Sequence, residues 1–186
     1  MLIGAIILAA GEARRFGRNK LIEKVGDKTI IERVLDAVKG LDRIVIVGKY
    51  YKDLMPYLEN EVVVYNPNWN EGLSSSLKLG LRFFSDYDGV LVLLGDMPLI
   101  SSETIKRIIS AFKEGCSAVV PTYKGQRGNP VLISRKLFEK LKNLKGDIGA
   151  RAILVEERNV CEVECGEEVI IDVDTPSDLA SVRRLL

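Results

Sequence analysis

Histidine is absent from this chain of 186 residues. Its imidazole is the commonest general base near neutral pH and a preferred ligand of zinc. A protein without it must use carboxylates, lysine, arginine, hydroxyl groups or a hard cation for any chemistry that it performs.

Cysteine is scarce, with Cys116, Cys161 and Cys165 as the whole set. An odd number without a C-x-x-C pair is not typical of a disulfide-stapled protein or of a zinc site. We therefore predict no disulfide framework and expect three buried side chains that act as small hydrophobic groups.

Neither a long hydrophobic run nor an excess of one charge is present. The formal net charge is +1, so no global field favours nucleic acid or a membrane surface, and we expect neither as a partner. Residues 1–10 are apolar but lack the basic start of a signal peptide, and no run reaches membrane-spanning length. We expect a cytoplasmic protein.

The length and the pattern of apolar segments predict one domain over residues 1–186. Strands are expected at residues 3–8, 43–47, 61–65, 89–94, 118–121, 131–133 and 169–173. Helices are expected at residues 29–38, 52–58, 72–84, 102–113, 136–141, 148–156 and 176–184. Continuously apolar strands that alternate with helices are typical of an α/β three-layer sandwich, a mostly parallel twisted sheet with helices on both faces.

A basic loop follows the first strand. It has small residues at Ala9, Ala10 and Gly11, a second glycine at Gly17 and a lysine at Lys20. Its other cations are Arg14, Arg15 and Arg18. Backbone N–H groups can approach a ligand closely at small residues, and the cations can neutralise phosphate charge. The spacing fits neither the P-loop nor the dinucleotide fingerprint. Taken alone, the loop is either another kind of phosphate site or a solvated basic turn.

Acidic residues follow two further segments. Asp96 comes directly after the apolar strand at 89–94, and Asp172 and Asp174 end the segment expected as the last strand. Carboxylates at the carboxyl ends of strands are suitable ligands for Mg²⁺ bound to phosphate. Asp96 can instead belong to a turn, and Asp174 can instead start the final helix.

Six segments along nearly the whole chain carry a further signal. They are Leu8 to Lys20 (LAAGEARRFGRNK), Asn66 to Leu77 (NPNWNEGLSSSL), Leu94 to Pro98 (LGDMP), Arg127 to Pro130 (RGNP), Gly146 to Arg151 (GDIGAR) and Asp172 to Leu179 (DVDTPSDL). In sequence and in order they resemble segments of the nucleotidyltransferases that complete the molybdenum cofactor, the cytidylyltransferases and the related MobA-like enzymes. Ala13 and Phe16 stand where the family often has Ser and Met.

This resemblance implies a Rossmann-like nucleotidyltransferase fold and a Mg²⁺-dependent enzyme that transfers CMP from CTP to molybdopterin cofactor. The N-terminal half would bind the nucleotide and the C-terminal half the acceptor. Arg15, Lys20 and Asp96 would be catalytic, and Asp96, Asp172 and Asp174 would hold the metal. The nucleotide would contact Leu8, Ala9, Ala10, Gly11, Arg15, Lys20, Asn66, Gly72, Ser74 and Ser75. The acceptor would contact Arg127, Gly128, Asn129 and Arg151.

Several alternatives remain open at this stage. They are a guanylyltransferase on the same cofactor, a sugar-phosphate or polyol-phosphate nucleotidyltransferase, and a non-catalytic carrier of the finished cofactor. Ala9-Ala10-Gly11 favours cytidine, because guanylyl members tend to have L-A-G-G. A monomer or weak homodimer that docks to a molybdoenzyme or its chaperone is expected.

Overall fold

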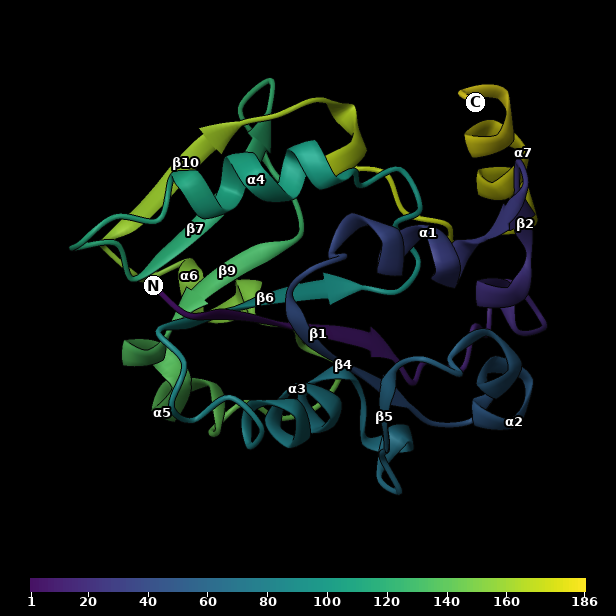
Figure 1. Cartoon of the computed structure of the whole chain (residues 1–186), viewed down its shortest axis with the longest axis horizontal. Coiled ribbons are helices and arrows are strands. Elements are labelled where there is room, and N and C mark those ends of the chain that lie inside the picture. The colour runs from purple at the N-terminus through teal and green to yellow at the C-terminus, as the bar shows by residue number, and fades with distance from the viewer.

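A mostly parallel sheet forms the centre of the computed structural model, which describes residues 1–186 (Figure 1). The strand order is β10-β7-β9-β6-β1-β4-β5, with β8 paired to β7. The strands are β1 (Ile3–Ala9), β4 (Asp42–Val47), β5 (Val62–Tyr65), β6 (Gly89–Leu94), β7 (Ala118–Tyr123), β8 (Gln126–Arg127), β9 (Val131–Ser134) and β10 (Val160–Glu164). Only β8 and β9 run antiparallel to their neighbours. Parallel β1, β4 and β6 therefore bring their carboxyl ends to one edge.

Helices cover both faces of this sheet, as expected. Alternate residues of β1 belong to two separate cores, with Ile7 in one and Ile6 in the other. The first core packs against α1 (Ile30–Ala37), α2 (Tyr51–Leu54), α4 (Ser102–Ser110) and α7 (Pro176–Arg184). The second packs against α3 (Leu73–Leu81), α5 (Phe138–Leu141) and α6 (Arg151–Leu154). A strand buried on both faces explains why β1 is continuously apolar.

The last helix of the chain packs beside a small hairpin from its N-terminal part. Strands β2 (Lys24–Val25) and β3 (Lys28–Thr29) form this antiparallel pair, and α7 lies beside it (Figure 1). Arg183 Nε donates a hydrogen bond to the carbonyl oxygen of Lys24 at 2.9 Å. The final helix is thus anchored next to the segment that follows the basic loop.

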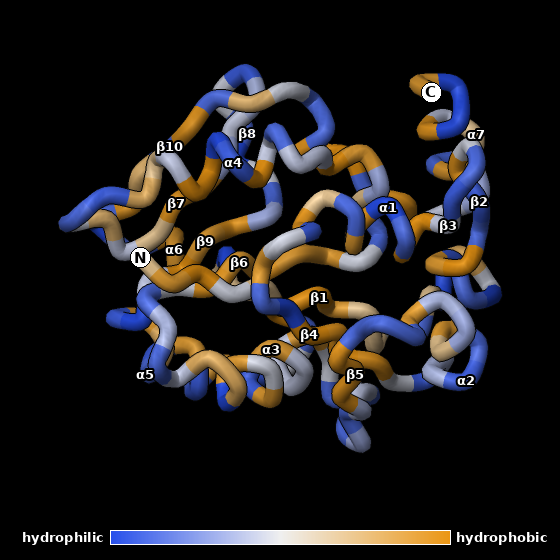
Figure 2. Tube along the Cα trace, in the orientation of Figure 1, coloured by the Kyte–Doolittle hydropathy of each residue, from blue (hydrophilic) through white to orange (hydrophobic).

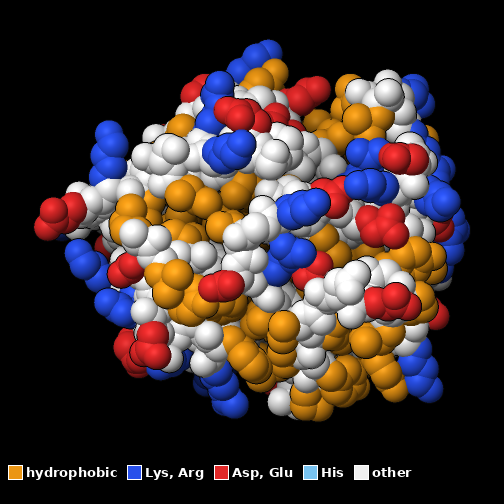
Figure 3. Space-filling view, viewed as in Figure 1, with side chains coloured by type: hydrophobic (Ala, Val, Ile, Leu, Met, Phe, Trp, Pro, Cys, Tyr) orange, Lys and Arg blue, Asp and Glu red, His pale blue; other side chains and the backbone are white.

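Hydrophobic and hydrophilic residues are distributed according to the layers of the fold. The central strands are the most hydrophobic part of the trace, whereas the turns between elements are mostly hydrophilic (Figure 2). Positive and negative side chains are interspersed over the face shown in Figure 3, in keeping with the formal net charge of +1. None of the helices has the length and apolar character needed to cross a lipid bilayer.

The last predicted strand was placed in the wrong segment. Residues 169–173 lie outside the sheet, and their first residue ends a short 3-10 helix, Glu167–Val169. The edge strand is β10 instead, where every position is half-buried or exposed because only β7 pairs with it. The sequence did not reveal this strand because it carries polar residues, which an edge strand can have.

Several predicted helices are shorter than expected. Within the segment 148–156, only the four residues of α6 are helical. Helix α2 ends at Leu54, and a 3-10 helix that contains Pro56 begins at Met55. Proline removes a backbone donor, which accounts for the early end of α2.

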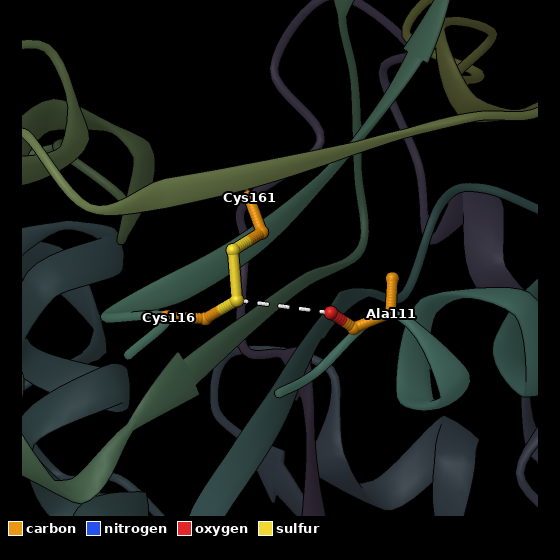
Figure 4. Close-up of a disulfide and its surroundings, with 3 residues drawn as sticks. All are labelled: Ala111, Cys116 and Cys161. Atoms are coloured by element: carbon orange, nitrogen blue, oxygen red, sulfur yellow. Dashed lines mark hydrogen bonds between the residues drawn. A yellow bond between two sulfur atoms is a disulfide. The ribbon is translucent and has the colours of Figure 1, made fainter. Parts of the chain in front are cut away.

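Two of the cysteines form a disulfide, so the prediction that all three are unpaired is wrong. Cys116 and Cys161 are bridged, and Cys165 is free and buried. Figure 4 shows the bridge next to Ala111 at the end of α4, whose carbonyl oxygen lies 3.7 Å from Cys116 Sγ. The pairing depends on β10, because Cys161 lies opposite Val119 of β7 and so comes close to Cys116. Without β10, the sequence offered no reason to pair them.

The disulfide should stabilise the fold by fastening the edge strand. It closes a separation of 45 residues, and cross-links of this kind contribute about 2–4 kcal/mol to the free energy of unfolding. We expect dithiothreitol, or Cys161→Ser, to lower the denaturant midpoint accordingly. Cys165→Ala is the control, because it should keep the full response to dithiothreitol. An unchanged midpoint after complete reduction would contradict this assignment.

Candidate active site

The basic loop turns back on itself after β1. Ala13 and Gly17 have positive φ values of 49° and 83°, and Gly17 N donates to the carbonyl oxygen of Ala13 at 2.9 Å. Phe16 is buried in the core and anchors the middle of the loop. A 3-10 helix, Lys20–Ile22, follows, so Lys20 returns to the edge where β1 and β6 end.

Lys20 joins segments that are far apart in the sequence. Its Nζ donates to Asp96 Oδ2 at 2.9 Å and to Asp174 Oδ1 at 3.2 Å. Asp174 also accepts a hydrogen bond from Arg15 Nη2 at 3.0 Å. The side chains of Lys20 and Asp96 are only 14% and 18% exposed, so this pair is held with little solvent around it.

Asp172 and Asp174 reach the same place although their segment is not a strand. Val173 between them is buried, and its N–H donates to the carbonyl oxygen of Asp96 at 2.9 Å. One carboxylate oxygen from each of Asp96, Asp172 and Asp174 lies within 4.8 Å of the others.

Asp174 does not cap the final helix, contrary to the expected competing use. Thr175 is the N-cap of α7, and its side chain accepts from Asp178 N. The Asp178 carboxylate accepts from the N–H groups of Asp174 and Thr175 in return. This capping box leaves the Asp174 carboxylate for Arg15 and Lys20.

The acidic cluster is short of positive charge. Burial raises the pKa of Asp96, although Lys20 opposes the shift. Burial and then repulsion from Asp96 and Asp174 raise the pKa of Asp172 to about 6. Burial disfavours the charged form of Lys20, but the attraction of Asp96 and Asp174 outweighs it and raises the pKa of Lys20. Two cationic side chains thus face three carboxylates, and a further cation would relieve the repulsion.

The residues present fit a hard divalent cation. Oxygen ligands from carboxylates are what Mg²⁺ and similar ions prefer. The second oxygen of Asp96, Oδ1, is buried and accepts no hydrogen bond. A buried carboxylate oxygen without a partner is costly unless something binds to it. Asp96, Asp172 and Asp174 are therefore the candidate ligand set.

A cavity of about 710 Å³ opens beside this cluster. Most of the residues predicted at the nucleotide and metal sites line it: Leu8, Ala9, Ala10, Gly11, Arg15, Lys20, Gly72, Asp96, Asp172 and Asp174. Arg14 lines it too and is paired with Glu12, whereas Arg18 lies outside it and pairs with Glu23.

Three residues predicted to touch the nucleotide do not line this cavity: Asn66, Ser74 and Ser75. Asn66 Nδ2 donates to the hydroxyl oxygens of Ser75 and Ser76, both at 2.9 Å. The Ser74 hydroxyl donates to the carbonyl oxygen of Gly146 at 2.7 Å. These polar groups fix the start of α3 in position.

A smaller cavity of about 360 Å³ adjoins the first, since Leu8, Leu73 and Leu94 line both. Ten of its 14 lining residues are hydrophobic. Three of the residues predicted to contact the acceptor line it together, namely Arg127, Asn129 and Arg151. Gly128 does not line it. A Cβ there would lie 2.1 Å from the carbonyl oxygen of Val169, so Gly128 serves close packing.

Arg127 already has partners within the protein. Its Nε donates to Glu162 Oε1 at 2.8 Å and its Nη1 to the carbonyl oxygen of Leu154 at 3.4 Å. Glu162 lies on β10, the strand that the sequence did not reveal. The orientation of Arg127 therefore depends on the edge of the sheet.

Sequence reasoning did not assign a role to several residues that line the large cavity: Asn19, Trp69, Asn70, Glu71, Ser76 and Asp147. Asn19 is adjacent to Lys20 in the sequence, and this position is the one feature that could have indicated a place at the same site. Asp147 lies in a segment that the resemblance assigns to the acceptor. Its Oδ1 nevertheless accepts a hydrogen bond from Leu73 N at 3.1 Å, so it caps the start of α3 although it lies 74 residues further along the chain.

The chain is similar in sequence and in fold to several known proteins. The model of the MobA-like NTP transferase domain matches residues 5–160. A probable molybdenum cofactor guanylyltransferase of Aquifex aeolicus is 31% identical over 182 residues, which cover 95% of this chain and 88% of the relative. The molybdenum cofactor cytidylyltransferase of Escherichia coli is 26% identical over 187 residues, 97% of this chain and 95% of the relative. A crystal structure of Rv0371C of Mycobacterium tuberculosis in complex with manganese has a TM-score of 0.85 and 27% identity, with 100% of both chains covered.

The carboxylate cluster predicts a measurable divalent-cation site. We expect Mn²⁺ to bind the wild-type protein and Asp96→Asn to weaken that binding at least tenfold, because the variant loses the charge of the most buried ligand. Calorimetry or electron paramagnetic resonance of bound Mn²⁺ measures the difference. Asp27→Asn is the matched control, since Asp27 is exposed and lies outside the cluster. Equal Mn²⁺ affinity in wild type and Asp96→Asn would exclude this site.

Proposed function

Because this chain belongs to the MobA-like NTP transferase family and is a nucleotidyltransferase, we propose that it transfers CMP from CTP to the terminal phosphate of molybdopterin cofactor. The observation that carries this proposal is the pair of adjoining cavities, one lined by cations and carboxylates and the other by apolar residues and two arginines. Two substrates can meet at the leucines that line both.

The large cavity suits a nucleoside triphosphate. Arg15 and Lys20 provide positive charge on one wall, and Ala9, Ala10 and Gly11 let the backbone come close to the ligand. We assign triphosphate binding to these residues. All of them come from the N-terminal half, whereas Asp172 and Asp174, which line the same cavity, come from the end of the chain.

Asp96, Asp172 and Asp174 would hold Mg²⁺. The bound ion would neutralise charge on the triphosphate and favour departure of pyrophosphate. Lys20 contributes to the same task from the protein side, because its ammonium group lies between Asp96 and Asp174 and faces the cavity. The chain's own cations and carboxylates thus set the position of the triphosphate.

The small cavity suits a flat heterocycle that carries an anionic group. Its apolar walls would bury the ring, and Arg151 together with the free Nη2 of Arg127 can pair with phosphate. We therefore assign the acceptor to the C-terminal half of the chain.

The reaction needs no general base. A terminal phosphate oxygen of the acceptor attacks the α-phosphorus of CTP, a new phosphorus–oxygen bond forms, and the bond to pyrophosphate breaks. A phosphate with a second pKa of about 6 is already largely ionised near neutral pH. Positioning and neutralisation of charge are what remain for the protein. This account is consistent with a chain that lacks histidine.

Guanylyl transfer is the second candidate, and the Aquifex relative favours it, since that protein is described as a probable guanylyltransferase. Ala10 supports cytidine instead. Ala10 lines the large cavity, although its methyl group is buried in the second core close to Gly48. The support for cytidine is the resemblance, because guanylyl members tend to have Gly where this chain has Ala10.

We expect turnover with CTP to exceed turnover with GTP. Shape alone discriminates by about 1–3 kcal/mol, so the ratio of kcat/KM should be roughly 10 to 100. The assay measures pyrophosphate release with each of the four nucleoside triphosphates and purified molybdopterin cofactor. Better turnover with GTP would favour guanylyl transfer, and binding of the cofactor without pyrophosphate release would indicate a carrier.

Asp96→Asn should reduce Mg²⁺-dependent pyrophosphate release by roughly two orders of magnitude or more, because stabilisation of charge by the metal is impaired. Asp172→Asn and Asp174→Asn should each cost less, and the double variant should not be additive if the two act at one site. Thermal unfolding of each variant provides the control for folding. Normal turnover by a folded Asp96→Asn protein would overturn the metal assignment.

Arg127→Ala should weaken binding of the cofactor and leave the affinity for CTP nearly unchanged, because Arg127 lines only the small cavity. Calorimetry with each ligand separates the two effects. Arg127→Lys should recover only part of the loss, since lysine cannot reproduce the guanidinium fork. Lost affinity for CTP would show that the two cavities have been assigned incorrectly.

A further inference from the structure

We infer that Asn19 is a further ligand-binding residue, whose side-chain amide donates a hydrogen bond to a non-bridging oxygen in the part of the bound triphosphate that leaves as pyrophosphate. This inference rests on the proposed nucleotide site and assigns it a residue that neither the motifs nor the comparisons identified. Asn19 lines the large cavity, and its side chain is nearly fully buried, at 6% exposure.

The orientation of the Asn19 amide is fixed by the backbone. Its Oδ1 accepts a hydrogen bond from Leu21 N at 3.2 Å and so caps the 3-10 helix that carries Lys20. An amide has one acceptor end and one donor end, so the Nδ2 group must point the other way. The bond to Leu21 thus fixes the position of a neutral donor on a residue that lines the cavity.

That donor has no partner in the protein. Three buried side-chain atoms in the molecule lack a hydrogen bond, Asn19 Nδ2, Asp96 Oδ1 and Ser117 Oγ. The first two belong to residues that line the large cavity. Leaving a buried amide without a partner is unfavourable, so most native structures avoid it.

Asn66 shows how this chain satisfies a buried asparagine elsewhere. Its Nδ2 donates to two serine hydroxyls, and its Oδ1 accepts from Asn68 N at 2.9 Å. Asn19 differs in keeping its donor unpaired beside a cavity lined by Arg15 and Lys20. Cationic surroundings attract an anion, and phosphate oxygens are acceptors, so the triphosphate supplies the missing partner.

Two substitutions separate this role from the capping role. Asn19→Asp keeps an acceptor for Leu21 N and the size of the side chain, but it replaces the donor with an oxygen. Asn19→Ser also keeps a capping oxygen, without adding charge. Asn143→Asp is the control for charge, because Asn143 is exposed and lines neither cavity.

The test is calorimetry of inorganic pyrophosphate and of CTP, each with Mg²⁺, on the wild type and the three variants. We expect both Asn19 variants to lose roughly tenfold or more in affinity for both ligands, as for the loss of one hydrogen bond to a charged group. Their melting temperatures should stay near that of the wild type, and Asn143→Asp should bind normally.

Unchanged affinity in Asn19→Ser would overturn the inference. A loss of affinity for CTP alone would overturn it too, because that result would place the contact on the α-phosphate or the nucleoside. If Asn19→Asp does not fold, Asn19→Ser decides the matter. The proposed function fails by a different result, absence of pyrophosphate release by a wild-type protein that binds CTP. The binding experiment with pyrophosphate does not depend on the acceptor.

Discussion

Electrostatic attraction between Lys20 and two carboxylates determines how the functional end of this molecule is put together. Asp96 follows the central strand β6, Asp174 precedes the last helix, and Lys20 follows the loop after β1. Lys20 is only 14% exposed, and the attraction of these carboxylates outweighs the cost of its burial and raises its pKa. The loop, the helix start and the strand end are therefore held in one arrangement by a single ammonium group.

The supporting structure is built to bring these groups together. Parallel strands deliver Ala9 and Leu94 to the same edge of the sheet, and the bond from Val173 N to the Asp96 carbonyl brings the last acidic pair alongside. The capping box of Thr175 and Asp178 starts α7 without using the carboxylate of Asp174. These local contacts leave the carboxylates of Asp96, Asp172 and Asp174 available to the site. Only two cationic side chains face these three carboxylates.

Much of this arrangement could be predicted from the sequence, and the exceptions have physical causes. Apolar runs such as β1 and β6 are buried on both faces, so hydrophobicity alone reveals them. Edge strand β10 is half exposed and carries polar residues, so its pattern was missed, and with it the partner of Cys116 and the partner of Arg127. Asn66, Ser74 and Ser75 share a segment with residues that line the cavity, but spacing cannot tell whether a hydroxyl faces a ligand or the protein.

The leucines that line both cavities have a consequence for the fidelity of the reaction. Leu8, Leu73 and Leu94 provide no hydrogen-bonding side chains at the junction where two substrates would meet. Water is poorly retained against such a surface, so few solvent molecules would compete with the acceptor for the activated phosphorus. Under the proposed function, this apolar junction between the two cavities would disfavour hydrolysis of the bound nucleotide during the time before the acceptor arrives.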